Sequence, residues 1–421
     1  MDSSSFRKTI RLLGNREFSS YILIRFSVIF ALFMQTTVIS YQMYTITGNP
    51  LSLGLIGLAE LIPALGFAFF AGYIVDRREK RGVYMLCILL YVVNALLLLW
   101  IMDRFFGGNL IAKYTEWLIY ASMFFNGSIR AFLAPASFSI LPQLVDKMEI
   151  PQAVTWSSTS WLLGSVLGPL AGGILMSHIG VSPTLGIALL FLIVSLLSIF
   201  RIRKRPVVMS KNIGLIKGLA QGFRFVFRSQ IILAVLSLDL FAVLFGGAEA
   251  LLPIFANDIL NVGEVGFGWL RSAHGIGSIF LLLVLAYLPL KNNIGYKLLA
   301  CVAGFGICIL LFGLSTHFYL SFALLFFAGL FDGVSVVIRH SILQLKTPEE
   351  MKGRVSSINM MFISSSNELG AFESGFAARY LGTVPSVVLG GIMTLVVVVI
   401  TYFSAPSLRM FKLDAEVQSD Y

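Results

Sequence analysis

The sequence has few charged residues and few cysteines. Asp, Glu, Lys and Arg make up 12% of the 421 residues, whereas a soluble domain usually contains about 25%. The three cysteines lie inside apolar runs, which indicates small apolar side chains and excludes a disulfide framework or a metal site; they are Cys87, Cys301 and Cys308. Together with 57% hydrophobic residues and a mean hydropathy of +0.87, this composition predicts an integral membrane protein.

Motifs for catalysis and nucleotide binding are also missing. The sequence contains no HExxH, GxSxG or Walker-type loop, and it has no cluster of His, Cys and carboxylate residues at one depth. We therefore expect neither an enzyme nor an ATP-driven pump, and no bound metal or cofactor. The net charge of +10 would suit a nucleic-acid partner, but the basic residues lie in loops between apolar runs. Lipid headgroups and membrane topology explain them, so we expect no nucleic acid.

Apolar runs long enough to cross a bilayer recur along the chain. A helix of about 20 residues spans the ~30 Å of hydrocarbon. Runs of this length occur at 19–45, 51–75, 82–102, 116–141, 152–178, 183–200, 231–255, 266–289, 296–314, 318–342, 355–380 and 384–404. The sequence therefore predicts an all-α membrane protein with twelve transmembrane helices.

Basic residues are distributed unequally between alternate loops. With the N-terminus inside, 24 of the 31 Lys and Arg residues fall in predicted cytoplasmic segments and 4 in outer ones. This bias predicts that both termini are cytoplasmic. Segment 201–228 alone has eight basic residues and no acidic ones. Part of it is amphipathic, so it predicts either a helix on the inner leaflet or a solvated linker.

The two halves of the sequence resemble each other. SILPQLVDKMEIPQAV at 139–154 resembles SILQLKTPEEMKGRV at 341–355, and each follows a span that carries an arginine. A constant offset of 202 in residue number links two glycines of one half to two of the other: Gly168 to Gly370 and Gly173 to Gly375.

Such a repeat predicts two six-helix bundles related in parallel, an arrangement that places a site between the two halves of a transporter. We predict bundles at 1–200 and 231–421, joined by a basic cytoplasmic linker at 201–230.

The loop GYIVDRREKR at 72–81 resembles the G-x-x-x-D-R-x-G-R-K loop of the major facilitator superfamily. The matching residues are Gly72, Asp76, Arg77, Lys80 and Arg81, whereas Glu79 replaces the second glycine. The resemblance implies a gating loop whose charges latch the cytoplasmic helix ends. A loop of solvated surface charges is the alternative interpretation.

The stretch GSVLGPLAGGIL at 164–175 is similar to the superfamily's G-x-x-x-G-P-x-x-G-G motif, which is associated with proton-exchanging exporters. The matching residues are Gly164, Gly168, Pro169, Gly172 and Gly173. Small residues four apart allow close helix packing. We expect this stripe to slide against a helix of the other half, and plain packing is the alternative.

Further stretches resemble the bacterial branch of the superfamily that includes enterobactin exporters and drug efflux proteins. They lie at 47–63, 130–145, 239–260 and 347–355, so the resemblance covers nearly the whole chain. It implies a secondary active transporter of the bacterial inner membrane, monomeric and surrounded by lipid. We expect export of a siderophore-like or drug-like organic solute by proton antiport and alternating access. An importer, a lipid or metal-ion transporter of this fold and a non-transporting sensor are alternatives.

Ionisable residues inside the predicted spans are functional candidates. A carboxyl group in an apolar cavity holds its proton more tightly than in water, and a nearby arginine favours the ionised form. Moving an arginine would therefore load and release a proton. Candidates for proton coupling are Glu60, Asp239, Glu249, Asp332 and Glu368. Glu60 and Asp239 lead because they lie in family-like segments, although structural ion pairing or substrate contact would also explain each residue.

One basic and several aromatic residues are candidates for lining a cavity that accepts an aromatic or amphipathic solute. They are Arg130, Tyr41, Tyr44, Trp156, Trp161 and Phe245. Packing between helices is the alternative for the aromatic residues. Arg339 lies nearer a cytoplasmic helix end, from which its long side chain is expected to reach the membrane surface.

The topology is testable by cysteine labelling. A single cysteine at Ser4 or Ser210, in a background without native cysteines, should resist an impermeant thiol reagent added to intact cells. The matched control is a cysteine at Lys113, in a predicted outer loop, which should react. Labelling at Ser4 or Ser210 in intact cells would contradict the twelve-helix topology.

Overall fold

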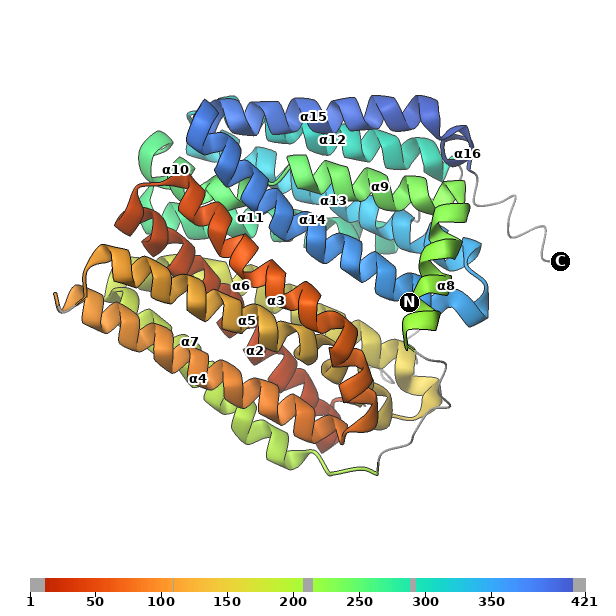
Figure 1. Cartoon of the computed structure of the whole chain (residues 1–421), viewed down its shortest axis with the longest axis horizontal. Coiled ribbons are helices and arrows are strands. Elements are labelled where there is room, and N and C mark those ends of the chain that lie inside the picture. Colours follow the sequence, from red (N-terminus) through yellow and green to blue (C-terminus); the bar gives the residue numbers. More distant parts are fainter. Residues whose placement is uncertain (1–11, 109, 207–214, 288–292, 412–421) are drawn as a thin grey trace. The chain divides into compact units, whose positions relative to one another are not determined.

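The computed structural model describes residues 12–108, 110–206, 215–287 and 293–411, and it is built of helices and short connections (Figure 1). The described residues contain no strand. Helices satisfy their own backbone hydrogen bonds, which a segment in hydrocarbon requires because water is absent there. The all-α prediction is confirmed.

The described helices of the first half are α2 (Arg16–Thr47), α3 (Pro50–Arg77), α4 (Lys80–Phe106), α5 (Ala112–Ile140), α6 (Ile150–Ile179) and α7 (Val181–Ser198). The 3₁₀ turns η1 (Leu141–Gln143) and η2 (Lys147–Glu149) connect α5 to α6, and η3 (Ile199–Arg201) follows α7.

The described helices of the second half are α8 (Leu215–Arg228), α9 (Gln230–Phe245), α10 (Leu252–Ile254), α11 (Gly263–Tyr287), α12 (Ile294–Leu314), α13 (Phe318–Lys346), α14 (Lys352–Leu381), α15 (Thr383–Ser404) and α16 (Pro406–Arg409). Between them lie η4 (Ala248–Leu251), the π-helix η5 (Phe255–Ile259) and the 3₁₀ turn η6 (Glu349–Met351).

Ten helical stretches in the described part of the chain are long and apolar enough to cross a membrane. The two other predicted spans correspond to α5 and α14, with 29 and 30 residues. Because an α-helix rises by about 1.5 Å per residue, both are also long enough to span. Both carry charged residues in their middle, Arg130 in α5 and Glu368 in α14. Their polarity, and not their length, separates them from the other ten.

The chain divides into two compact units. Unit 1 contains the described residues of Met1–Gly48, Ala59–Lys211 and Gly263–Ser272. Unit 2 contains those of Asn49–Leu58, Asn212–Val262 and Ala273–Tyr421. Each unit is therefore built mainly from one half of the sequence and includes one short segment from the other half. Within unit 2, α12 and α15 lie side by side, and α9 also packs on α15 (Figure 1).

The glycine stripe of α6 packs against α2. A Cβ atom at Gly168 would lie 2.7 Å from the Phe30 carbonyl oxygen, and one at Gly164 would lie 3.0 Å from the Phe30 nitrogen. Only a residue without a side chain permits this approach of two helix backbones. The partner of the stripe is therefore a helix of the same half, which differs from our expectation of a helix in the other half.

Gly173, next to the stripe, faces α11, a helix of the second half whose first residues, Gly263–Ser272, belong to unit 1. The expected contact with a helix of the other half is therefore made at Gly173 and not by the stripe. A Cβ there would lie 2.8 Å from the Cα of Gly268 on α11. Unit 2 repeats this contact, because a Cβ at Gly375 of α14 would lie 2.8 Å from the Cα of Gly54 on α3. Each glycine of the first contact thus has a counterpart in the second, on the corresponding helix of the other half.

The contact between the stripe and α2 also has an equivalent in unit 2. Gly370, the counterpart of Gly168 in the sequence repeat, packs on α9, where its Cβ would lie 2.8 Å from the Val243 carbonyl oxygen. The internal repeat predicted from a few glycines therefore appears as repeated backbone contacts.

The described part of the linker helix α8 packs on α14. Val226 is fully buried, and a Cβ at Gly222 would lie 2.9 Å from the Ile358 side chain. Arg354 also donates a hydrogen bond to the Gln221 side chain at 2.7 Å. The predicted helix is present, but part of its apolar surface meets protein and not lipid. Residues 207–214 of the basic linker lie outside the described residues.

The α2–α6 contact gives a stability prediction. Gly168→Ala should lower the midpoint of thermal unfolding in detergent, because forcing a methyl group into a packed contact costs about 1–3 kcal/mol. Gly186→Ala in α7 is the matched control, since its Cβ would lie 3.8 Å from the nearest atom, Leu99 Cδ1. Equal unfolding midpoints for the two variants would show that α2 can move away from α6 without loss of stability.

Candidate functional site

Two of the predicted residues form an ion pair in unit 1. Arg130 Nη1 of α5 lies 2.9 Å from Glu60 Oε1 of α3, and Glu60 is 8% exposed. Gly127 precedes Arg130 by one helical turn and packs on the Glu60 backbone, where a Cβ would lie 2.8 Å from the carbonyl carbon. Residues three apart share one helix face. The close contact at Gly127 therefore places the guanidinium beside the carboxylate.

A second buried pair lies in unit 2. Asp239 of α9 is ion-paired with Arg339 of α13, and the two residues are 7% and 4% exposed. The expectation that Arg339 reaches the membrane surface is wrong. Its charge is neutralised inside the unit, because a buried cation without a partner is much more costly than a paired one. Both leading candidates for proton coupling thus have an arginine partner.

A histidine that the sequence interpretation did not select joins two other candidates. His274 Nε2 of α11 lies 3.3 Å from Asp332 Oδ2 of α13, and its Nδ1 lies 3.8 Å from Glu249 Oε1 of η4. The side chains of Glu249, His274 and Asp332 are 60%, 25% and 30% exposed. Gly329 of α13 packs on the His274 backbone, where a Cβ would lie 2.7 Å from the His274 Cα.

One member of each charged pair lies at an equivalent position of the sequence repeat. Gly127 and Arg130 of α5 correspond to Gly329 and Asp332 of α13, at the same offset in residue number that relates Gly168 to Gly370. In both helices the glycine makes the backbone contact, and the residue three positions later carries the charge.

The second member of each pair also lies at an equivalent position in the two halves. Glu60 lies six positions after Gly54 on α3, and His274 lies six positions after Gly268 on α11. Since Gly54 and Gly268 make equivalent contacts, Glu60–Arg130 and His274–Asp332 are equivalent pairs in the two repeats. The geometry is repeated, but the acid and the base have exchanged helices.

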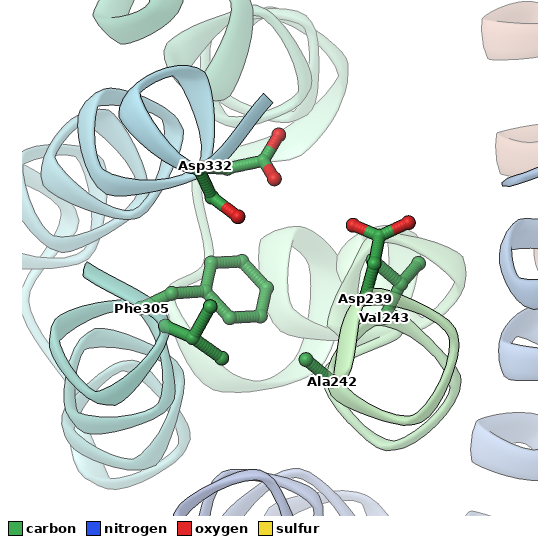
Figure 2. A pocket seen from close by; sticks show the side chains of 7 residues that line it. Asp239, Ala242, Val243, Phe305 and Asp332 are labelled. Carbon is green, nitrogen blue, oxygen red and sulfur yellow. The ribbon is translucent and has the colours of Figure 1, made fainter. Parts of the chain in front are cut away.

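Asp332 and Asp239 line one pocket in unit 2. The pocket is small, with a cavity volume of about 10 Å³, and is lined by Asp239, Ala242, Val243, Val302, Phe305, Asp332 and Ser335. Figure 2 shows the Asp332 and Asp239 carboxylates on different helices, with the Phe305 ring on a third helix beside them. One member of each pair, Asp332 and Asp239, therefore lines the same pocket.

The span that carries Asp239 and Glu249 is broken. α9 ends at Phe245, and the 3₁₀ turn η4 with Glu249 follows Gly246 and Gly247. We predicted one continuous apolar run here, although adjacent glycines favour a break. In transporters, interrupted helices border central sites. The break places Glu249 within reach of the His274 ring.

The remaining coupling candidate and the aromatic candidates have other neighbours. Glu368 lies beside α3, because a Cβ at Gly57 would be 3.5 Å from its Oε2. Tyr41 is 7% exposed, and its ring centroid lies 5.5 Å from that of Phe267. Trp161 is 41% exposed. Tyr44, Trp156 and Phe245 are half-buried. The pocket wall instead contains Phe305, which the sequence did not single out.

Glu79 of the gating loop caps the start of α4, which the motif comparison did not predict. Glu79, which replaces the motif glycine, accepts hydrogen bonds from the backbone nitrogens of Arg81 (3.0 Å) and Gly82 (2.9 Å) at the start of α4. Its φ of −64° is open to any residue, so no glycine is required there. The substitution that weakened the motif match therefore satisfies two free N–H groups of a helix end.

Two basic residues of this loop contact backbone carbonyls of unit 1. Lys80 Nζ donates to Val75 O at 2.5 Å, and Arg81 Nε donates to Ile199 O at 3.1 Å. Arg77 is exposed, Gly72 has open space where a Cβ would lie, and Asp76 lies in α3 with its side chain outside the described part. Arg81 thus links the α3–α4 turn to the end of α7.

Comparisons with known proteins agree with this architecture. The family model of the Major Facilitator Superfamily matches residues 21–371. The chain is 25% identical to "Enterobactin exporter EntS" of Shigella boydii serotype 18 (strain CDC 3083-94 / BS512) over 423 residues, which cover 98% of this chain and 97% of that protein.

Two solved structures share the fold. A bacterial homologue of the iron transporter ferroportin in an inward-facing state is 13% identical, with a TM-score of 0.73 and coverage of 94% of this chain and 99% of that chain. A D-xylose–proton symporter is 12% identical, with a TM-score of 0.72 and the same coverage. At these identities the likeness supports the twelve-helix fold alone.

The unit 1 ion pair gives a second stability prediction. Arg130→Met should lower the unfolding midpoint, because removing one partner of a buried pair costs about 3–5 kcal/mol. The Arg130 side chain is 35% exposed, so we expect the lower end of this range. The double variant Arg130→Met/Glu60→Gln removes both charges and should recover part of the loss. A double variant no more stable than Arg130→Met would contradict the pairing.

Proposed function

Because the chain belongs to the Major Facilitator Superfamily, as its motifs predicted, we propose that this multi-pass membrane transporter exports an organic solute in exchange for protons. The solute is siderophore-like or drug-like, and the protein works as a monomer in the bacterial inner membrane with both termini cytoplasmic. Transport follows alternating access between inward-facing and outward-facing states.

Export is supported mainly by the complete G-x-x-x-G-P-x-x-G-G motif at 164–175 in α6. The chain is also similar over 98% of its length to a protein named as an enterobactin exporter. The motif glycines bring α6 close to the backbones of α2 and α11, with few side-chain atoms at the contact. Contacts of this kind can slide, because they contain few side chains that would need to repack. An organic solute also suits the name of this relative.

A metal-ion cargo has less support. The described residues contain no group of three or more His, Cys, Asp or Glu side chains arranged to hold a metal ion. The likeness to a ferroportin homologue concerns the fold alone. We therefore retain the organic solute as the proposed cargo.

The intramembrane charges are the set in which we propose that the proton-coupling groups are found. Glu60, Asp239, Asp332 and Glu249 all lie on membrane-spanning segments and contact arginine or histidine partners. A transporter that moves such partners during its cycle changes how strongly each carboxyl group holds a proton. The gating loop, with Asp76, Lys80 and Arg81, is proposed to stabilise the state that is closed on the cytoplasmic side.

Direction and coupling can be tested together in inverted membrane vesicles whose lumen is acidified by respiration. The probes are enterobactin and ethidium, added outside. Antiport moves the probe inwards and protons outwards, so one probe should partly collapse the pH gradient, and only in vesicles that contain the protein. A solute–proton symporter would carry protons inwards with the probe and deepen the gradient. Failure of both probes to change the gradient would contradict the proposal for these two solute classes.

A further inference from the structure

We propose that His274 and Asp332 are the groups that carry the transported proton, while the equivalent pair Glu60–Arg130 stays permanently charged. This inference rests on the proposed proton-coupled transport. It names a residue, His274, that lies outside both sequence motifs, and it assigns different tasks to the two repeats.

The first support is the chemistry of the two equivalent pairs. Arginine keeps its charge at any physiological pH. A histidine changes charge between about pH 5 and 8, the range in which a transmembrane pH gradient operates. At the repeated position, Gly127 and Gly329 hold the helices equally close, but only the second pair contains a group that titrates in this range.

The second support is the row of ionisable groups on either side of the ring. Glu249 is the most exposed member, with 60% of its side chain accessible, and its Oε1 lies 3.8 Å from His274 Nδ1. The opposite ring nitrogen, Nε2, lies 3.3 Å from Asp332. Asp332 shares its pocket with Asp239, whose side chain is only 8% exposed. The groups therefore lead from the exposed Glu249 through the ring to Asp332, which lines the pocket.

The surroundings of the ring are consistent with this task. The charged groups that meet it in the described structure are Glu249 from η4 and Asp332 from α13, and α12 contributes the Phe305 ring at 6.4 Å between centroids. Arg271 lies three residues earlier on α11, with its guanidinium over Phe267. Beyond the pocket, Arg339 neutralises Asp239, so Asp332 has His274 as its basic partner.

In the proposed transfer, the His274 ring takes up one proton and releases another. Glu249, or water beside it, gives a proton to His274 Nδ1, which forms an imidazolium. The imidazolium gives the proton on Nε2 to Asp332, and the neutral ring remains with its proton on Nδ1. The ring regains its first tautomer by exchanging protons with water. Asp332 then holds the proton beside the pocket until the transporter opens to the cytoplasm.

The transport test uses proteoliposomes with enterobactin and ethidium as probes. In wild type, an imposed pH gradient should drive accumulation, and preloaded probe should also exchange without a gradient. His274→Gln and Asp332→Asn should keep exchange and lose gradient-driven accumulation, because neither variant can pass the proton on. His340→Gln, on the same helix as Asp332, is the control and should behave like wild type.

The outcomes separate the two proposals. Wild-type protein without gradient-driven accumulation of either probe would overturn proton antiport of these solutes, and the assignment of His274 with it. Wild-type accumulation that survives in His274→Gln would overturn the assignment of His274 alone.

A second measurement does not depend on transport or on the folding of the His274 variant. In protein labelled with ¹⁵N-histidine, replacing each of the other three histidines in turn identifies the remaining ring signal as that of His274. This signal should titrate between about pH 5 and 8, and Asp332→Asn should shift the titration midpoint. The proposal would be overturned if the ring stayed in one protonation state over this range, or if Asp332→Asn left its titration midpoint unchanged.

Discussion

A charge placed between membrane-spanning helices must find its partner inside the protein, because hydrocarbon supplies neither water nor a counter-ion. An unpaired Arg, Lys or Asp at the centre of a span costs roughly 2.5–3.5 kcal/mol on the insertion scale. The structure meets this constraint at helix contacts that glycine makes possible. Gly127 brings α5 against the Glu60 backbone, and Gly329 brings α13 against the His274 backbone. In each helix the residue one turn later carries the charge, so the close contact and the charged pair occur together as one motif.

The internal repeat contains this motif twice, with different charged side chains in the two copies. The correspondence between the two halves that relates the glycine contacts also relates the members of the two charged pairs. Repetition preserves where two helices touch, because that depends on backbone positions. It leaves the side chains free to change as long as each charge keeps a partner. One copy is therefore a Glu–Arg pair, and the other is an Asp–His pair that we propose changes its charge.

The sequence predicted the helices, the helical character of the linker and the repeat, because hydropathy, basic residues and glycine spacing depend on local composition. It also identified Glu60, Asp239 and Asp332 as charged residues inside spans. It did not predict their partners, which depend on helix rotation and relative depth. Arg339 therefore meets Asp239 and not the membrane surface, and His274 joins Asp332, which lies far from it in the sequence. Glu79 counted as a mismatch because the motif records residue types and not the capping bonds that another residue can make.

The difference between the two pairs also determines which of them can link a pH gradient to movement. A ligand shifts a conformational equilibrium only by the difference in its affinity for the two states, and this holds for protons. A Glu–Arg pair that binds no proton in either state contributes nothing to that difference, however much it stabilises the fold. A change of one pKa unit between states is worth about 1.4 kcal/mol, so a histidine–aspartate pair whose surroundings change during the cycle can supply useful coupling. Stability and coupling thus impose opposite requirements on the same contact, and a duplicated fold can satisfy both by assigning one copy to each.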